Sequence, residues 1–398
     1  MKKVKLGELI KVQRGYHFSS KNYVKRSDFA LATLANISPN NDFQYNENKL
    51  KFYGADFPDR FILKPNDLIM PLTQQTNGLF GNTAFVPETK NFSFVLNTAV
   101  GKIIPNNEIV DINFLHFLFS TKWMIKQMEK RSLGTKQSNL YNSVLYDIDV
   151  YIPNLETQRK IGKLLHLIEQ KIIINNQIND NLLKQCNLIY NSLFANGKIK
   201  QWEEGKKIEK VKLKFFCDKI VTGKTPPTSN PDFFDEKIPF ITIDDLRQSL
   251  FITETNRKLS DKGANFQLNK FIPPNSLCVS CIATIGELSF TTEISQTNQQ
   301  INSLIFSNDE YREYVYFSLK NIFKNISVKS GNIFNNLNKE EFSSIEILKP
   351  NAKDLTKFNT IAKSLFAKIK INTYENKILH RLINYLLPLL MNNQITIR

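Results

Sequence analysis

Several short motifs in this 398-residue sequence carry residue types that could bind a metal or a phosphate. Cys278-Val279-Ser280-Cys281 has the spacing of half a zinc site. No second pair of this kind follows, and the four histidines lie far from it, so we interpret it as a buried strand with two free thiols. Gly223-Lys224-Thr225 ends like a Walker A phosphate loop, but Asp218 stands where that loop needs its first glycine.

Two further motifs have residues in common with DNA-modifying active sites. Asn230-Pro231-Asp232-Phe233 falls one residue short of the Asn-Pro-Pro-aromatic loop that holds a flipped adenine in amino-methyltransferases, and no glycine-rich turn offers a place for the methyl donor. Asp232 and Asp235-Glu236-Lys237 are too close together for a nuclease metal site on two adjacent strands. We therefore predict a binding protein with no catalytic residues and no metal site.

The sequence is strongly basic. With 53 Lys and Arg against 37 Asp and Glu, the formal net charge is +16 at pH 7. Because 41% of the residues are hydrophobic and only 23% are charged, this charge belongs on folded surfaces rather than on a disordered tail. Three interpretations stay open: a nucleic-acid partner, an anionic membrane, or a genome whose codon bias favours Lys and Asn.

The sequence also contains indications of its compartment. The N-terminal Met1–Gly7 is basic but no apolar stretch follows it, and no run of about 18 uncharged apolar residues occurs. Four cysteines in a chain of this length do not form a disulfide framework. We therefore expect a cytoplasmic protein.

An internal repeat organises the sequence. Ile148–Asn154 matches Ile345–Asn351, and their prolines, Pro153 and Pro350, are 197 residues apart. Further matches follow in the same order: Gly134 with Asn139-Leu140 matches Gly331 with Asn336-Leu337, Pro65–Leu68 matches Pro274–Leu277, and Val4–Leu6 matches Val211–Leu213. This order indicates a duplication, with two copies of one module, each followed by a long helix.

Each copy ends in a long amphipathic pattern. Apolar residues recur every three or four positions from Asn154 to Phe194 and again over 361–389. Asn154 and Asn351 each follow a proline and can cap a helix start, and Asn196-Gly197 is a stop signal for the first helix. A helix of about forty residues spans about 60 Å, so we predict that the two helices pack together. The alternative is that each lies on its own domain.

Asn175 and Asn372, again 197 residues apart, interrupt the two apolar stripes near their midpoints. If the helices pack antiparallel about a pseudo-two-fold axis, we expect these residues to meet and to set the helix register, because a buried asparagine pair penalises slipped pairings. In a chain this rich in asparagine, chance coincidence is the alternative. Under the first interpretation, replacing both with leucine raises thermal stability and loosens the arrangement.

Landmarks along the whole chain together resemble one known family. They are the Thr222–Pro226 loop, the Pro239–Leu246 strand, the Pro274–Leu277 turn, and Pro153–Ile161, where Pro-x-x-x-x-Gln-x-x-Ile opens a heptad helix. The chain thereby resembles the specificity (S) subunit of a type I restriction–modification system. It departs from that pattern at Lys353–Phe358, which lacks the Gln, and at Arg14–His17, which replaces the usual Gly-x-Thr-Pro.

The resemblance and the repeat together predict an organisation. Short β-branched runs, with one helix expected at about 113–130 and another at about 310–326, indicate α+β modules. We expect two pseudo-repeated target-recognition domains joined by two long helices that form an antiparallel coiled coil. The expected ranges are 1–152 for recognition domain 1, 153–196 for the first helix, 197–210 for a linker, 211–349 for recognition domain 2, and 350–398 for the second helix.

The resemblance also implies partners. Each domain would read one half of a bipartite double-stranded DNA target, while helix length sets the unread spacer. Two modification subunits would dock on outer apolar positions of the helices: Leu164, Leu183, Ile383 and Leu390. We expect no cofactor on this chain, because S-adenosylmethionine would be bound by the modification subunits, and ATP and Mg²⁺ would serve the motor/nuclease subunits.

Reading DNA needs donors and acceptors on loops held by a folded module. The candidate contacts in the first module are Arg14, Tyr16, Lys21, Tyr23, Thr73, Gln74, Gln75, Asn77, Arg131, Lys136, Gln137 and Asn139. Those in the second module are Thr222, Lys224, Thr225, Gln296, Asn298, Gln299, Gln300, Lys329, Ser330 and Asn332. Each of these loops has an alternative interpretation as an ordinary solvated turn.

Two other functions stay open. One is an autonomous DNA methyltransferase or nuclease with degenerate motifs, which would bind S-adenosylmethionine or a catalytic metal by itself. The other is a coiled-coil scaffold with incidental basic charge, which would bind DNA weakly and without regard to its sequence.

Overall fold

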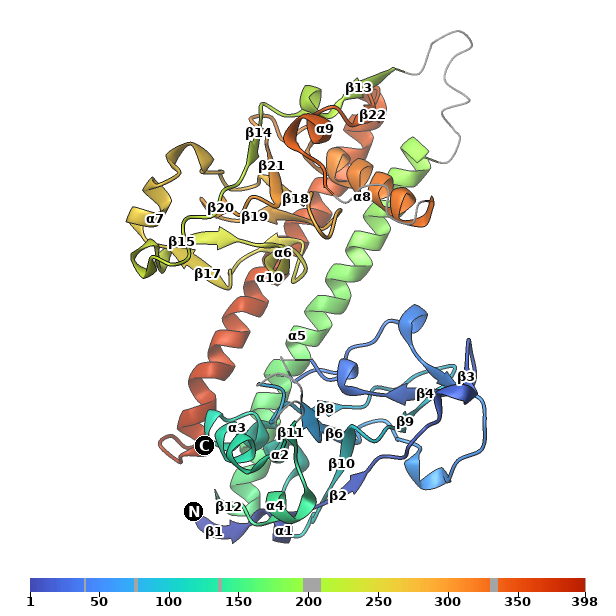
Figure 1. Ribbon diagram of the computed structural model, residues 1–398, viewed down its shortest axis with the longest axis vertical. Coiled ribbons are helices and arrows are strands. Elements are labelled where there is room, and N and C mark those ends of the chain that lie inside the picture. The colour runs from blue at the N-terminus through green and yellow to red at the C-terminus, as the bar shows by residue number, and fades with distance from the viewer. Residues whose placement is uncertain (39–40, 75–77, 135–137, 196–208, 330–335, 398) are drawn as a thin grey trace. The chain divides into compact units, whose positions relative to one another are not determined.

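The computed structural model describes residues 1–38, 41–74, 78–134, 138–195, 209–329 and 336–397. The chain divides into two compact units, unit 1 with Met1–Gln170 and Arg381–Arg398, and unit 2 with Lys171–His380. Each unit contains one repeated module and a segment of both long helices, α5 (Leu155–Tyr190) and α10 (Ala352–Met391) (Figure 1). The predicted α+β class is confirmed, because each module mixes small sheets with short helices.

The module of unit 1 is built on small sheets. Its main sheet has the order β2-β10-β6-β8, and a second sheet has the order β3-β5-β4-β9, in which β4 and β9 run parallel. Its strands are β1 (Lys2–Lys5), β2 (Ile10–Arg14), β3 (Tyr23–Val24), β4 (Phe29–Ala32), β5 (Phe52–Tyr53), β6 (Leu68–Pro71), β7 (Thr73–Gln74), β8 (Ala84–Phe85), β9 (Ser93–Leu96), β10 (Val100–Pro105), β11 (Ser138–Asn139) and β12 (Asp149–Ile152). Its helices are α1 (Leu6–Leu9), α2 (Ile112–Phe119), α3 (Lys122–Arg131) and α4 (Asn142–Tyr146).

The module of unit 2 repeats this plan. Its main sheet has the order β14-β21-β18-β19-β16, and its second sheet has the order β17-β15-β20, in which β15 and β20 run parallel. Its strands are β13 (Lys210–Lys212), β14 (Lys219–Thr222), β15 (Phe234–Ile241), β16 (Phe251–Ile252), β17 (Arg257–Leu259), β18 (Leu277–Ser280), β19 (Leu288–Thr291), β20 (Gln296–Thr297), β21 (Ile301–Ile305) and β22 (Glu346–Leu348). Its helices are α6 (Ile243–Leu246), α7 (Asp261–Asn265), α8 (Arg312–Lys329) and α9 (Lys339–Ser343).

Strand register shows that the two modules are copies. Val4 of β1 pairs with Val150 of β12, and Val211 of β13 pairs with Ile347 of β22. Val150 and Ile347 are 197 residues apart, the same offset as the two Pro-Asn motifs. The repeated sequence therefore forms the same antiparallel pair at the base of each module.

The predicted helix starts are confirmed. The Asn154 side chain accepts a hydrogen bond from the backbone N–H of Thr157 at 2.9 Å, and Asn351 accepts one from Asp354 at 2.7 Å. α5 continues beyond Tyr190 as a π-helical turn, Asn191–Ala195. The expected stop at Asn196-Gly197 lies outside the described residues.

The glutamine of the first helix start fastens the helix to its module. Gln158 is fully buried, accepts a hydrogen bond from the N–H of Asp111, and donates to the carbonyl of Ile109. In the second copy its position is taken by buried Leu355, while Asn359, one turn later, donates to the carbonyl of Glu310. In the second copy, the backbone just before α8 is therefore held by a side chain one helical turn later. This explains why a glutamine is not needed at the position of Leu355.

The predicted helix at about 113–130 is wrong in one respect, because it is two helices. α2 ends at Phe119, and Thr121 caps α3 by accepting a hydrogen bond from the N–H of Met124 at 3.3 Å. The Thr121 hydroxyl also donates to the carbonyl of Leu118, which closes α2. Its counterpart α8 is continuous.

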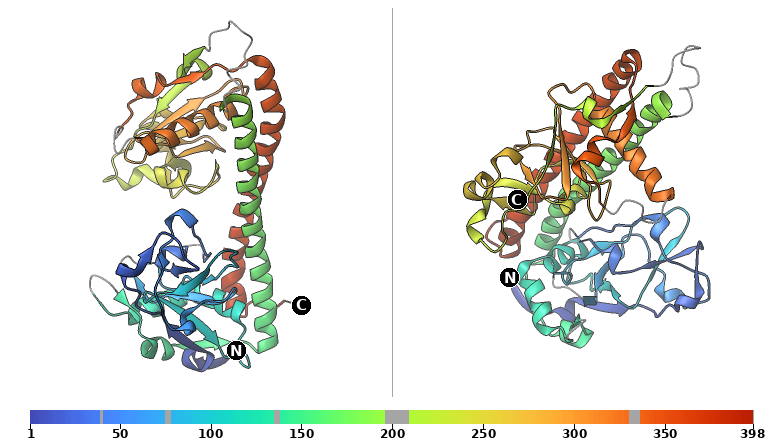
Figure 2. Two further views of the ribbon diagram at one scale, coloured as in Figure 1. Left: turned by 90° about the vertical axis from the view of Figure 1, so that its right-hand side faces the viewer. Right: turned by 45° about the horizontal axis from the view of Figure 1, so that its top comes forward.

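Within unit 2, α5 and α10 lie side by side and run antiparallel (Figure 1, Figure 2). Asn175 and Asn372 are both 1% exposed, but they do not hydrogen-bond to each other. Instead, Asn175 donates to Asn376 at 2.9 Å, and Asn372 donates to Asn179 at 2.9 Å. At the offset of 197, Asn175 corresponds to Asn372 and Asn179 corresponds to Asn376. The two hydrogen-bonded pairs are therefore equivalent, and the pseudo-two-fold axis passes between them. Each midpoint asparagine therefore bonds to an asparagine four residues from the partner we expected.

These partners make a double-mutant cycle informative. Asn175→Leu alone leaves the side-chain oxygen of Asn376 without its donor, so we expect it to lower the free energy of unfolding by about 1–3 kcal/mol. Asn175→Leu with Asn376→Leu removes both partners, and we expect it to be neutral or stabilising relative to the native chain. Chemical denaturation of the four proteins measures this. Equal losses in the single and double variants would contradict the paired arrangement.

The outer apolar positions predicted for partner binding are wrong in part. Leu390 is only 1% exposed and belongs to the core of unit 1, because α10 packs its last turns against that module. Leu164 and Leu183 are partly buried against the cores of their own units. Ile383 is half-buried.

Candidate nucleic-acid interface

In each module a glycine allows two loops to cross. A Cβ on Gly223 would lie 2.2 Å from the carbonyl oxygens of both Thr297 and Asn298, and one on Gly15 would lie 2.0 Å from that of Asn97. The backbone N–H after each glycine donates across the crossing, from Lys224 to Thr297 at 3.0 Å and from Tyr16 to Leu96 at 2.9 Å. Only glycine permits this close approach, which places the residues after it beside the loop that follows the parallel strand.

In unit 2 this crossing brings together two of the predicted DNA-contacting loops. The Thr225 hydroxyl donates to the Gln299 side chain at 2.5 Å, and Thr222 donates to Asn302 at 2.6 Å. Lys224 and Gln299 are exposed, and the Lys224 ammonium lies 4.9 Å from the centre of the Phe266 ring. Lys224, Thr225 and Gln299 thus form a polar surface cluster with hydrogen-bond donors and a positive charge, while Asn302 supports it from the interior.

The other predicted residues of this module differ in burial. Gln296 is fully buried and is held by Gln267 and by the carbonyl of Ala264, so it braces the loop from inside. Asn298 donates to Gln300 at 3.0 Å, and its oxygen accepts from the N–H of Gln300 at 3.1 Å. Lys329 ends α8, but its side chain lies outside the described residues, as do Ser330 and Asn332.

In unit 1 most of the predicted contacts hold the module together. The Gln74 side chain is 3% exposed and accepts from the backbone of Leu79 and Phe80, while Arg14 donates to the carbonyl of Leu140. Asn139 pairs with Thr73 between β11 and β7. Gln75, Asn77, Lys136 and Gln137 lie outside the described residues.

The remaining predicted residues of unit 1 divide between the surface and the interior. Lys21 is exposed. Tyr16 packs at 5.1 Å against both Phe18 and Phe61, Tyr23 packs on Tyr53, and Arg131 bonds to Gln127 one turn away. Among the described candidate side chains of unit 1, Lys21 is therefore the one most open to a surface ligand.

Sequence reasoning missed the counterpart of the Asn298 loop. Asn97 follows β9 as Asn298 follows β20, and each backbone N–H donates to the end of the neighbouring parallel strand, at Ala32 and Ile241. The shared signal is an Asn three residues before an apolar Val or Ile, together with an upstream glycine. It is short and could be recognised only once the modules are superposed.

A buried polar chain fastens the unit 1 module to α5. Thr83 bonds to Nδ1 of His116 at 2.7 Å, and Nε2 of His116 lies 3.0 Å from the carboxylate of Glu169 on α5. Because an ionised carboxylate can only accept, Nε2 of His116 carries a proton and donates to Glu169. The N–H of Thr83 also donates to Asn41, whose loop is thereby linked to the same chain.

Glu169 gives this connection a pH dependence. Burial favours a higher pKa for its carboxyl, but the neighbouring His116 and His166 bring the pKa below its ordinary value of 4.5. The ionised group therefore stabilises the fold above pH 4.5, and this contribution is lost as the pH falls through the folded pKa. For Asp42, burial and the charge of Glu169 raise the pKa of the carboxyl. The protonated carboxyl therefore stabilises the fold at low pH, and this stabilisation is lost as the pH rises through the folded pKa.

We expect Glu169→Gln to lower the free energy of unfolding at pH 7 by about 1–3 kcal/mol, because a charged hydrogen-bond acceptor is removed. The difference in the free energy of unfolding between the variant and the native chain should narrow at an acidic pH below 4.5, as the pH falls through the folded pKa of the native carboxylate. Chemical denaturation at the two pH values measures this, with exposed Glu156→Gln on the same helix as the matched control. If the difference in the free energy of unfolding between Glu169→Gln and the native chain grew at low pH, it would contradict the stabilising role of the ionised carboxylate.

The motifs with catalytic residue types have ordinary structural partners. Cys278 and Cys281 are buried free thiols, and burial raises the pKa of Cys278 to about 12 and that of Cys281 to about 11. Asp232 forms an ion pair with Lys262 at 2.9 Å, and Lys237 forms one with Asp261. Among the described residues, no group of three or more His, Cys, Asp or Glu is arranged to hold a metal ion.

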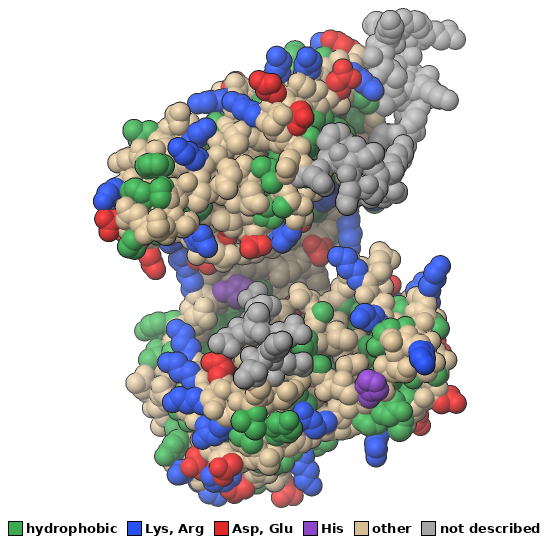
Figure 3. Space-filling model, in the orientation of Figure 1, with side chains coloured by type: hydrophobic (Ala, Val, Ile, Leu, Met, Phe, Trp, Pro, Cys, Tyr) green, Lys and Arg blue, Asp and Glu red, His purple; other side chains and the backbone are tan. Residues whose placement is uncertain are grey.

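Basic side chains occur on the visible face of each unit (Figure 3). This is the distribution expected when the charge of +16 belongs to folded surfaces. In the part of the chain that the structure describes, no helix has the length and apolarity needed to cross a membrane.

The fold defines a class of proteins in which paired α+β modules alternate with two long helices. The family model for the type I restriction modification DNA specificity domain matches residues 1–184 and 205–383, once for each module. The chain belongs to this family of specificity subunits. Its function is recognition of the DNA target, and it is non-catalytic, because the catalytic activities of such systems lie in partner subunits.

Relatives and solved structures agree with this assignment. The type I restriction enzyme HindI specificity subunit of Haemophilus influenzae is 30% identical, over 84% of this chain and 87% of that protein. The MjaIX specificity subunit of Methanocaldococcus jannaschii is 24% identical, over 76% of this chain and 73% of that protein. The crystal structure of the S subunit from M. genitalium has the same fold, with a TM-score of 0.57 and 13% identity over 98% of this chain and 95% of that one.

Proposed function

We propose that each module reads one half of a bipartite, asymmetric double-stranded DNA target. The supporting observation is that the same glycine crossing presents different side chains in the two modules. In unit 2 the crossing exposes Lys224 and Gln299, whereas the residues at these positions in unit 1 are Tyr16 and Thr98. Because base edges are distinguished by the donors and acceptors facing them, the two modules would select different sequences.

The helices would set the unread spacer and dock the modification subunits. Ile371, Tyr374 and Ile378 of α10 are exposed by 60%, 37% and 65%, at the three- and four-residue spacing of one helix face. Ile174 of α5, which is 48% exposed, corresponds to Ile371 at the offset of 197. Exposed apolar faces of this kind fit partner helices. The exposed isoleucine that both helices carry at this equivalent position fits two modification subunits, one for each half of the pseudo-symmetric pair.

The partners would supply the chemistry in a cytoplasmic complex. S-adenosylmethionine would be bound by the modification subunits, and motor/nuclease subunits would use ATP and Mg²⁺. The glycine crossing of unit 2 supports this division, because its side chains, Thr225, Gln299 and Lys224, are suited to recognition of DNA.

Docking can be tested with the exposed isoleucines. We expect Ile174→Asp combined with Ile378→Asp to abolish co-purification with a modification subunit, because a carboxylate would be buried at each contact. Lys363→Asp, also exposed on α10, is the matched control and should retain the partner. Circular dichroism checks that the variants fold. Undiminished binding by the isoleucine variant would refute docking on this face.

The two rival functions are separated by binding measurements on the isolated chain. Calorimetric binding of S-adenosylmethionine or of a catalytic metal would favour an autonomous enzyme. With a modification subunit present, affinity that is the same for every duplex sequence would favour a scaffold. The proposal requires neither ligand to bind the isolated chain and requires the assembled complex to prefer one bipartite duplex.

A further inference from the structure

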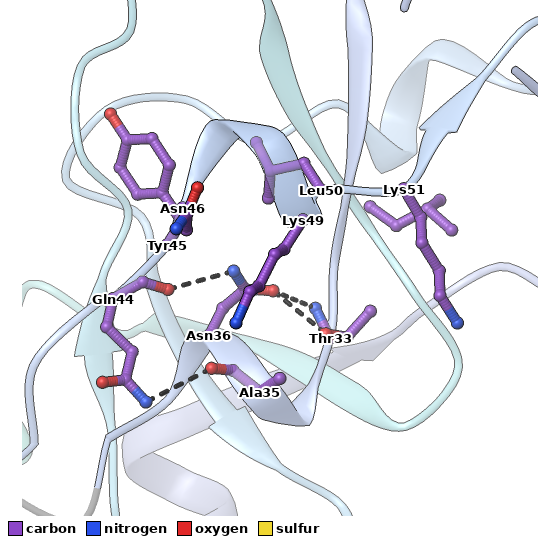
Figure 4. Close-up of a pocket in the computed structure, with 10 residues that line it drawn as sticks. Thr33, Ala35, Asn36, Gln44, Tyr45, Asn46, Lys49, Leu50 and Lys51 are labelled. Atoms are coloured by element: carbon purple, nitrogen blue, oxygen red, sulfur yellow. Dashed lines mark hydrogen bonds between the residues drawn. The ribbon is translucent and has the colours of Figure 1, made fainter. Parts of the chain in front are cut away.

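Unit 1 contains a pocket that the predicted contacts do not include. Its volume is about 560 Å³, and it lies between the 3₁₀ turn Leu34–Asn36 and the segment Gln44–Lys51 (Figure 4). Leu31, Ala35 and Leu50 contribute apolar surface, whereas Gln44, Tyr45, Asn46, Lys49 and Lys51 contribute polar groups. We call it the Asn36 pocket.

The wall of the Asn36 pocket is held in place by one buried amide. Asn36 is 5% exposed, and its oxygen accepts from the backbone and the hydroxyl of Thr33 at 2.8 and 3.1 Å. Its nitrogen donates to the carbonyl of Gln44 at 3.1 Å, which ties the two sides of the pocket together (Figure 4). The pocket is therefore preorganised without a ligand.

The charge of the pocket is positive and uncompensated. Lys49 and Lys51 are exposed, and no carboxylate among the described residues lies within ion-pair distance of either. The Lys51 ammonium lies 5.8 Å from the centre of the Tyr23 ring. Two such lysines beside a preformed cavity favour an anion.

The other groups point to a nucleotide rather than to a bare anion. The Tyr45 ring is 40% exposed and is supported edge-on by Phe43, Phe92 and Phe94. The exposed Gln44 amide makes one long contact, 3.4 Å to the carbonyl of Ala35, which a ligand can replace. An amide of this kind can pair with the edge of a base, and an apolar surface suits sugar and base faces.

The corresponding turn of unit 2 lacks these properties. Asp245 takes the place of Asn36, accepting from Thr242 at 2.7 Å and from the N–H of Asn256 at 2.9 Å. The nearby Arg247 is occupied by Asp244 and Glu287. A carboxylate at the base and a neutralised cation make that turn unsuited to a phosphate, so the feature is particular to the first module.

We propose that the Asn36 pocket holds one nucleotide step of the DNA half-site read by the first module. Lys49 and Lys51 each contact a backbone phosphate, and Gln44 contacts the edge of the adjoining base. This assignment rests on the proposed function, because it adds named contacts to the recognition of DNA by that module.

The test uses the full chain assembled with its modification subunits and a fluorescent duplex that carries the methylated target. At about 0.1 M salt we expect Lys49→Ala with Lys51→Ala to weaken binding about tenfold or more and to reduce the slope of log affinity against log salt by about 0.9 for each phosphate that is no longer neutralised. Lys122→Ala with Lys126→Ala on α3 removes the same charge from exposed positions and is the matched control. Equal weakening by both pairs would overturn the proposal.

Gln44 is tested by sequence preference. We expect Gln44→Ala to reduce discrimination about tenfold at one base pair of the first half-site and to leave the second half-site unchanged. Unchanged discrimination at every base pair would refute the role of Gln44. If the native complex prefers no bipartite duplex, the proposed function itself fails. If it does prefer one and the lysine variants behave like their control, only the pocket assignment fails.

Discussion

Phe366→Ala is expected to lower the free energy of unfolding of unit 2 by about 3–5 kcal/mol, the usual cost of removing a buried aromatic ring. Phe366 is 2% exposed on α10 and packs against the rings of Tyr316 at 5.8 Å, Phe290 at 5.9 Å and Phe317 at 6.0 Å. It therefore joins the helix to the core of the second module. Its removal should loosen the module that carries Lys224 and Gln299.

Amide hydrogen exchange measures this effect separately in each unit. Exchange should accelerate in β18 and β21, which belong to the module that packs against Phe366. Ile361→Ala is the matched control, because Ile361 lies on the same helix but is 43% exposed, and its effect should stay within about 0.5 kcal/mol. A destabilisation below about 1 kcal/mol for Phe366→Ala would contradict its place in the core.

Gly223→Val is expected to abolish recognition of one half of the DNA target. The new Cβ would lie 2.2 Å from two backbone oxygens, which cannot move without disturbing the loop after β20. Overpacking of this kind costs about 1–3 kcal/mol and sometimes more. We expect the distortion to separate Thr225 from Gln299 and to weaken binding of the cognate duplex by at least about tenfold.

The equivalent glycine and an unconstrained one provide the comparison. Gly15→Val should have the same effect on the other half of the target, because its Cβ would lie 2.0 Å from the carbonyl oxygen of Asn97. A Cβ on Gly78 would meet no atom within 4 Å, so for Gly78→Ala we expect only the cost of its positive φ of 97°, about 1–2 kcal/mol. Fluorescence binding with duplexes altered in one half at a time measures the effect. Recognition that survives Gly223→Val would contradict the crossing as the basis of that loop.

The duplication and the long helices could be predicted because repeated strands and helices leave a periodic pattern at a constant offset. The pair Val150 and Ile347 shows this, since both the sequence match and the strand register have the same offset. The break between α2 and α3 could not be predicted in the same way. Apolar residues continue on both sides of Thr121, and only its hydrogen bonds show that one helix ends and another begins.

Polar loops were harder to interpret because residue type does not reveal burial. Gln74 and Gln296 have the side chain of a base-reading residue, but both are buried and bonded to their own modules. Gln44 was missed because its environment is created by Asn36, eight residues away, and by a turn that no periodic pattern indicates. The hydrogen-bond partner of Asn175 could not be predicted either, because it depends on where the pseudo-two-fold axis crosses the helix pair. The spacing of two asparagines does not determine that position.

In the proposed function, each module reads one half of a bipartite target. It is tested most directly by mapping methylated adenines in cells that express the chain with its modification subunits. Residues 1–152 are exchanged for those of another family member, and the map is repeated. We predict a bipartite motif in which one half changes and the other half is retained. An unchanged motif, or one altered in both halves, would contradict the assignment of one half-site to each module.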